Sequence, residues 1–167
     1  MSLNRNSTGD LGRDGEGPVK ETESRSSAAG PETGSRSDVL STLLAEKDCL
    51  IADGAVGTNM MIAGLGPGDA PDFWNLDNPE PVADLHRRFV DAGSDIILSN
   101  TFGSNSPRLS LDGAEAQCLD INVAGAHLAR AAADGVDRPV VVAGSIGPTG
   151  ELMEPFGAMT VDEAYRA

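Results

Sequence analysis

The chain has 167 residues, with 12 basic and 26 acidic side chains and a formal net charge of −14 at pH 7. This length suits one domain. The negative surplus repels phosphate backbones and anionic lipid headgroups, and the only adjacent basic pair is Arg87-Arg88. We therefore expect no nucleic-acid partner and no membrane partner. The sequence has no apolar run of about 18 residues and no apolar N-terminal signal, which predicts a cytoplasmic protein.

Residues 1–37 are almost wholly small, polar or charged, and their few apolar residues are too scattered to form an apolar face. This composition predicts a disordered tail. The tail carries five basic and six acidic residues, a net charge of −1. The acidity of the chain therefore belongs to residues 38–167, the predicted folded part.

Helical and extended patterns alternate along residues 38–167. Apolar spacing predicts three helices, over residues 38–47, 79–92 and 114–133. Thr160 followed by Glu163 forms a capping box that opens a further helix. Short apolar runs predict three strands buried on both faces, at residues 49–52, 95–98 and 139–143. This order predicts an α/β fold with a parallel sheet and right-handed crossovers.

Two architectures begin with this order of elements. A doubly wound open sheet closes its core in roughly 130 to 150 residues, whereas an eight-fold barrel needs about 250. Three parallel strands leave an unpaired edge after the last one. By strand count the sheet is unfinished.

Small and polar residues follow each predicted strand. Asp53-Gly54 follows the first, residues 99–105 follow the second, and residues 144–150 follow the third. The carboxyl ends of parallel strands line the ligand crevice of α/β folds, so Asp53 can hold a ligand ammonium there. In the alternative interpretation Asp53 only caps local amides and the glycine-rich segment 144–150 is a plain turn.

Several other residues have chemistry that a site could use. The face of Trp74 can hold a methylammonium group by cation–π attraction, with packing as the alternative. His86 and His127 have no serine, cysteine or carboxylate at a triad spacing, so we expect them to be structural or solvated. We expect Cys49 and Cys118 to be small core residues, because no further cysteine or histidine completes a zinc pattern.

Four segments, in order, resemble the homocysteine S-methyltransferase family. They are residues 53–58, 76–80, 92–102 and 143–150. The resemblance spans about residues 43–167. It implies a TIM (β/α)8 barrel that transfers a methyl group from a small-molecule donor such as betaine to the thiolate of homocysteine, giving methionine. It also implies a zinc ion, held by three cysteines in the complete enzyme, that deprotonates the thiol.

The resemblance implies roles for six residues. Asp53 and Gly54 would contact the amino-acid part of homocysteine. Trp74 lies near the region where betaine-using members place a donor-binding aromatic residue. The other three would line the homocysteine pocket, namely Asn100, Thr101 and Phe102.

The sequence departs from the family in its metal ligands. The zinc cysteines of the family follow later strands, and Cys49 and Cys118 do not fall at those positions, so we carry over no metal ligand and no catalytic residue. We expect residues 38–167 to be the N-terminal part of the barrel, about three βα units, from a truncated product, a fragment or an incomplete gene. As given, the chain should neither bind catalytic zinc nor turn over.

An alternative is a non-catalytic α/β module that kept the pocket as a binding or interaction site. A half-barrel exposes a sheet edge and an apolar face, so it should aggregate or pair with a second copy as a homo-oligomer. An independent domain should be monomeric and unfold cooperatively. The sequence leaves the methyl donor open.

Overall fold

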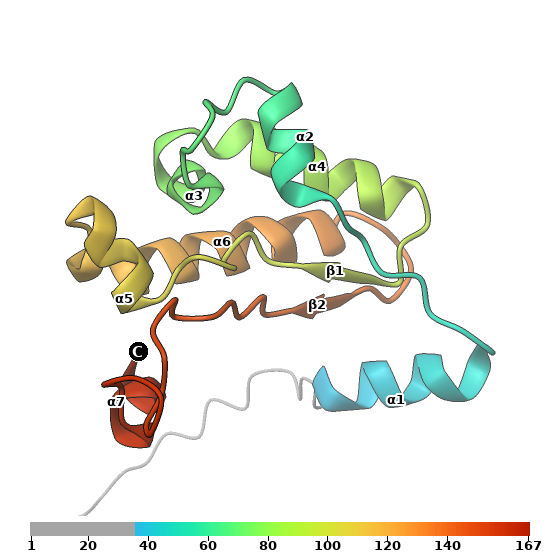
Figure 1. Ribbon diagram of the computed structural model, residues 1–167. Helices are drawn as coiled ribbons and strands as arrows, with labels where there is room; N and C mark the ends of the chain where they lie inside the picture. Colours follow the sequence, from blue (N-terminus) through green and yellow to red (C-terminus); the bar gives the residue numbers. More distant parts are fainter. Residues whose placement is uncertain (1–35) are drawn as a thin grey trace, which may run out of the picture. The chain divides into compact units, whose positions relative to one another are not determined.

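The computed structural model describes residues 36–167, which belong to one structural unit. The helices of this part are α1 Arg36–Glu46, α2 Val56–Ile62, α3 Trp74–Asp77, α4 Pro79–Asp91, α5 Ser106–Leu109, α6 Cys118–Ala133 and α7 Val161–Arg166 (Figure 1). The strands are β1 Ile96–Leu98 and β2 Val141–Ala143. Single 3₁₀ turns are formed by Pro71–Phe73, Ser110–Asp112 and Glu115–Gln117.

The predicted tail lies outside the described residues, except for residues 36 and 37, which begin α1. Within the described residues, no helix is both long enough and apolar enough to cross a membrane.

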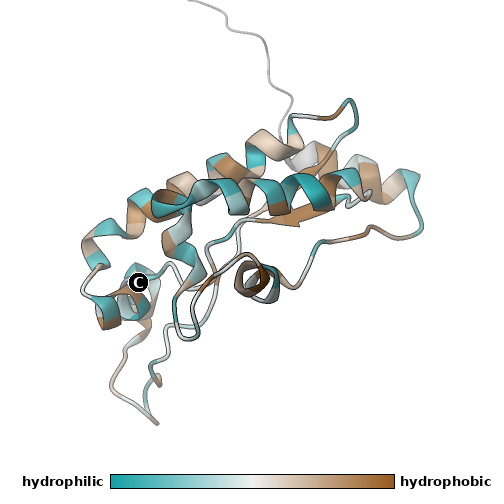
Figure 2. Ribbon diagram, turned by 90° about the horizontal axis from the view of Figure 1, so that it is seen from above, coloured by the Kyte–Doolittle hydropathy of each residue, from teal (hydrophilic) through white to brown (hydrophobic). Residues whose placement is uncertain are grey.

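The best-predicted helix is α4. Pro79 stands at its first position, where the missing amide hydrogen costs no bond. Val82, Leu85 and Val90 are buried, which follows from their helical spacing. Gly93 follows the helix with a φ of 103°, a left-handed conformation that glycine adopts without strain. Hydrophilic and hydrophobic residues alternate along the long helices (Figure 2).

The mixed α/β fold contains two parallel strands, with Ile96 opposite Val141 and Leu98 opposite Ala143. The helices α4 and α6 lie side by side over one face of this sheet (Figure 1). The core between them is a cluster of buried residues: Val90, Ile97, Ala129, Ala132, Ala133 and Val140. The alanines of α6 are small, so the helix approaches the sheet and α4 closely.

Of the three predicted strands, the second and third are present as β1 and β2, the first is not a strand, and neither β1 nor β2 is buried along its whole length. At residues 49–52 the structure has a single parallel bridge, from Ala52 to Ile96, and Ile51 is 59% exposed. Cys49 is exposed, so it is not the core residue that we expected. The strand β2 is only half-buried along its length. In the described part of the chain, no further strand pairs with the free edge of β2 or with the free side of residues 49–52.

Other expectations fare differently. The capping box is confirmed, since Thr160 and Glu163 exchange hydrogen bonds at the start of α7. The first helix begins at Arg36, two residues earlier than predicted, and Leu43 is buried whereas Leu44 is 59% exposed. The short helices α2, α3 and α5 were not predicted.

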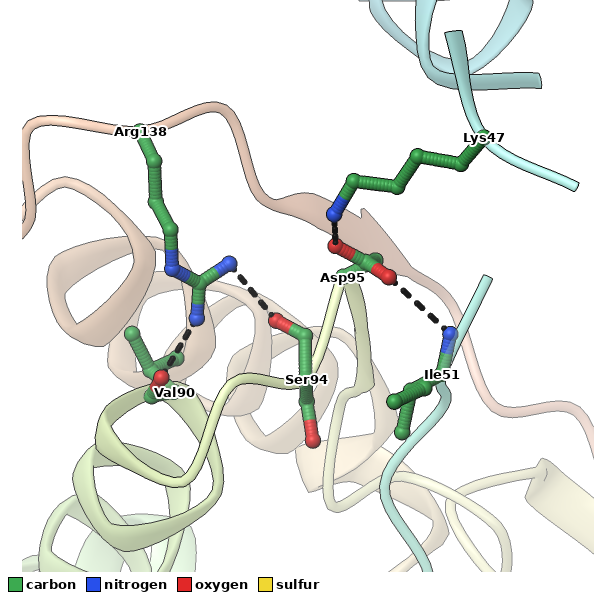
Figure 3. A network of polar contacts seen from close by, with 6 residues as sticks. All are labelled: Lys47, Ile51, Val90, Ser94, Asp95 and Arg138. Carbon is green, nitrogen blue, oxygen red and sulfur yellow. Dashed lines mark hydrogen bonds and ion pairs between the residues drawn. The ribbon is translucent and has the colours of Figure 1, made fainter. Parts of the chain in front are cut away.

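A polar network joins the end of α1 to the amino end of β1 (Figure 3). The Asp95 carboxylate accepts hydrogen bonds from the Lys47 ammonium and from the Ile51 amide, and these two donors hold the pKa of Asp95 below its ordinary value of 3.8. Arg138 donates to the backbone oxygens of Ser94 and Val90. The network therefore fastens the first segment and α4 at one end of the sheet, opposite to the carboxyl ends of the strands.

Candidate functional site

A cavity of about 710 Å³ lies at the carboxyl ends of the strands. All three segments that follow a predicted strand line it, namely residues 53–57, residues 98–103 and Ser145. Residues 68–72 and the region of α5 contribute further walls. Parallel strands place their carboxyl ends at the same edge of the sheet, so segments far apart in sequence meet here.

Asp53 stands where the first segment ends. Both of its carboxylate oxygens lie 3.1 Å from the Leu98 backbone nitrogen, which donates to them. Burial raises the pKa of Asp53 above its ordinary value of 3.8, and the Leu98 amide opposes that rise. A carboxylate has about four acceptor positions, so the bond to Leu98 leaves capacity for a ligand donor.

The backbone after Asp53 turns sharply into α2. Gly54 is exposed and lines the cavity, and a side chain there would meet no atom within 4 Å. Ala55 has a φ of 52° and a ψ of 35°, the left-handed conformation that a non-glycine residue rarely adopts. This strained residue lies in the wall of the cavity, which is where such backbone strain concentrates in proteins.

A ring of hydrogen bonds joins the loops after β1 and β2. The Thr101 hydroxyl donates to the Ser145 carbonyl at 2.8 Å and lies 2.7 Å from the Ser99 hydroxyl. The Ser145 amide donates to Ser99 Oγ at 3.1 Å. The hydroxyl of Thr101 is thus occupied in holding the two loops together.

The side-chain amide of Asn100 also forms its hydrogen bonds within the protein. Its side-chain nitrogen donates to the Pro71 carbonyl at 2.8 Å and to Asn75 Oδ1 at 3.0 Å. Asn75 in turn donates to the Asn100 carbonyl at 2.7 Å and to the Ile121 carbonyl at 3.3 Å. This buried pair of amides fixes the loop after β1 against α3 and α6.

Phe102 and Trp74 differ in their placement. Phe102 is 61% exposed and lines the cavity. Trp74 is half-buried and packs against the cluster of Met60, Leu65, Val82 and Leu85, and it is not among the described residues that line the cavity. The structure therefore brings together five of the six predicted site residues and places Trp74 in a core.

Sequence reasoning missed Asp72 and Arg108. Asp72 is buried, and its Oδ1 accepts hydrogen bonds from the Gly103 amide and the Ser104 hydroxyl, each at 2.9 Å. Its partners lie about thirty positions away, so no local pattern marks it. Arg108 lines the cavity, and one signal was available: it is the only basic residue between Arg88 and Arg130.

Comparison with known proteins identifies the family. The homocysteine S-methyltransferase profile matches residues 50–167. The chain belongs to the homocysteine S-methyltransferase family. It is 32% identical over 124 residues to a methionine synthase of Mycobacterium leprae and 31% identical over 112 residues to one of Mycobacterium tuberculosis. These matches cover 69% and 62% of this chain.

A solved homocysteine methyltransferase also has a similar fold. The metallated form of MmuM from Escherichia coli superposes with a TM-score of 0.59 and 27% sequence identity. That match covers 67% of this chain and 42% of MmuM, whereas the matches to the methionine synthases cover 10% and 9% of those proteins. The chain thus spans less than half the length of each of these relatives.

The residues of the described part do not fit a zinc site. Residues 36–167 contain no cluster of three or more histidine, cysteine, aspartate or glutamate side chains placed to hold a metal. Cys118 lies on α6, where its thiol donates to the Ser104 carbonyl at 3.3 Å. Cys49 is exposed ahead of the first segment.

Proposed function

We propose that residues 38–167 form about three βα units of a (β/α)8 barrel that transfers a methyl group from a small-molecule donor to homocysteine. The contribution of this chain is to hold the amino-acid part of homocysteine. The observation that supports it most strongly is the position of Asp53, a half-buried carboxylate in a cavity formed by the segments that follow the three predicted strands.

Each proposed site residue has a role that its contacts support. Asp53 accepts hydrogen bonds from the homocysteine ammonium on the positions that Leu98 leaves open. Gly54 offers an exposed backbone and Phe102 an exposed apolar wall. Asn100 and Thr101 keep the wall in place through their bonds to Asn75 and Ser145.

Titration calorimetry with L-homocysteine tests this function. Asp53→Asn removes the charge but keeps an oxygen acceptor for Leu98, so we expect it to weaken homocysteine binding by about ten- to a hundredfold. Asp91→Asn is the matched control, because Asp91 is exposed on α4 and does not line the cavity. Equal affinity of the wild type and Asp53→Asn would contradict the role of Asp53.

An assay of methyl transfer distinguishes a methyltransferase from a non-catalytic binding module. In a protein that turns over, Asp53→Ala should raise KM for homocysteine more than it lowers kcat, because the residue holds the substrate and takes no part in bond making. Homocysteine binding without methyl transfer from betaine or another donor would instead favour the non-catalytic binding module.

A further inference from the structure

Among the described residues that line the cavity, Arg108 is the only basic one. Four carboxylates share the lining with it: Asp53, Asp69, Asp72 and Asp112. A wall with this composition favours a ligand that carries a cationic group, but it also offers one position where a ligand anion is attracted.

The Arg108 guanidinium is not neutralised by the protein. Arg87 and Arg130 form ion pairs with Asp84 and Asp134, whereas Arg108 forms none with the described residues. Its side chain also donates no hydrogen bond within the described part of the chain, although it lies in a cavity with four carboxylates. An arginine fork has five N–H donors, and here they are available to a ligand.

The backbone of Arg108 is held in place. Asn105 caps α5 by accepting a hydrogen bond from the Arg108 amide at 3.1 Å. The Asn105 side chain also donates to the Pro148 carbonyl at 3.3 Å, which ties α5 to the loop after β2. A Cβ at Gly150 would lie 3.6 Å from Arg108 Cδ, so the stem of the arginine runs beside that loop.

We propose that Arg108 binds the carboxylate of a zwitterionic ligand in this cavity, and this inference rests on the proposed function. Guanidinium binds a carboxylate through two parallel hydrogen bonds, which lysine cannot reproduce. The carboxylate comes either from homocysteine or from a zwitterionic methyl donor such as betaine. Arg108 is then a specificity-determining residue that rejects cations lacking a carboxylate.

Two ligand pairs that differ only in the carboxylate test the proposal by titration calorimetry. The first pair is L-homocysteine and 3-aminopropane-1-thiol, which is homocysteine without its carboxylate. The second pair is betaine and choline, in which a hydroxymethyl group replaces the carboxylate. Each ligand is titrated into the 167-residue wild type, Arg108→Gln and Arg108→Lys. Arg88→Gln is the matched control, because Arg88 is also exposed but does not line the cavity.

We expect Arg108→Gln to weaken the binding of one of the two carboxylate ligands, homocysteine or betaine, by about ten- to a hundredfold. The analogue without a carboxylate should bind Arg108→Gln equally or more tightly, because a repelling charge has been removed. General damage to the site would weaken both members of a pair. Arg108→Lys should give intermediate affinity, and Arg88→Gln should behave as the wild type. The pair that responds identifies the source of the carboxylate.

Two results would overturn the inference, and they differ in what else they affect. If the wild type binds homocysteine and Arg108→Gln binds every ligand with the same affinity, Arg108 is no anchor and the proposed function stands. If the wild type binds neither homocysteine nor betaine, the proposed function fails together with the inference.

Discussion

The carboxylate of Asp53 and the backbone amide of Leu98 are joined across 45 positions of sequence, with both oxygens 3.1 Å from the nitrogen. The contact links the end of the first segment to the end of β1. Asp53 thus serves the fold and is proposed to serve the ligand, and the two roles can be separated by substitution.

Asp53→Ala and Asp53→Asn should differ in stability. Alanine leaves the Leu98 amide without its acceptor, which costs about 1–3 kcal/mol when the group is shielded from water. Asparagine keeps an oxygen at that position and should cost less than about 1 kcal/mol. Urea unfolding followed by circular dichroism measures both. Equal stabilities of the two variants would show that the contact contributes little.

His86 should make the protein sensitive to acid. It is 1% exposed, neither of its ring nitrogens has a partner within the described residues, and burial lowers its pKa from 6.5 to about 4. Between these pH values the unfolded chain binds a proton that folded His86 does not. The free energy of unfolding therefore falls as the pH is lowered from 6.5 towards 4, by up to about 3 kcal/mol from this residue.

The measurement is urea unfolding at pH 7.5 and pH 5. His86→Leu should lose part of the pH dependence, because the buried site no longer titrates. His127→Gln is the control, since His127 lies on α6 with an exposed side chain. A pH dependence that His86→Leu leaves intact would assign the acid sensitivity to other groups.

Gly125 is where α6 touches the site. A Cβ there would lie 2.7 Å from Asn75 Nδ2 and 2.7 Å from Thr101 Cγ2. Gly125→Ala should therefore destabilise the fold by about 1–3 kcal/mol and disturb the amide pair. Gly57→Ala is the opposite case, because no atom lies within 4 Å of its Cβ position in α2, and it should stabilise by up to about 1 kcal/mol. Thermal unfolding of both variants checks the difference in sign.

Ala55→Gly should stabilise the protein. Left-handed backbone costs a non-glycine residue about 1–2 kcal/mol, and Ala55 adopts it at the start of α2. Part of this gain is offset by the greater freedom of glycine in the unfolded chain. Ala63→Gly at the other end of α2 is the control, because Ala63 has an ordinary right-handed backbone and gains nothing from glycine. A loss of stability in Ala55→Gly would argue against strain at Ala55.

Much of the architecture was predictable because its signals are local. Proline, apolar spacing and a terminal glycine mark α4, and Thr160 with Glu163 marks the start of α7. The burial of the first segment was not predictable, because an apolar run such as that containing Ile51 does not show which neighbours will cover it. The short helices α2 and α5 depend on tertiary contacts, as the fully buried Met60 and Leu109 show.

The candidate site also has a part that the sequence predicted and a part that it did not. Motifs after the strands predicted that Asp53 and residues 99–105 would share one edge of the sheet, and Asp53 and residues 99–103 line the cavity. The contact of Asp72 with Gly103 and Ser104 could not be predicted, because it depends on how the loop before α3 folds back. Trp74 shows the limit of a chemical argument from residue type, since its ring packs against the Met60 cluster.

A crystal structure of the chain with L-homocysteine tests the central claim most directly. The account predicts that the ligand ammonium lies within hydrogen-bond distance, about 2.7–3.2 Å, of the Asp53 carboxylate. It also predicts that Asp53 keeps its bond to Leu98 and that Phe102 contacts the ligand. Homocysteine bound outside the cavity, or inside it with Asp53 in contact only with Leu98, would contradict the account.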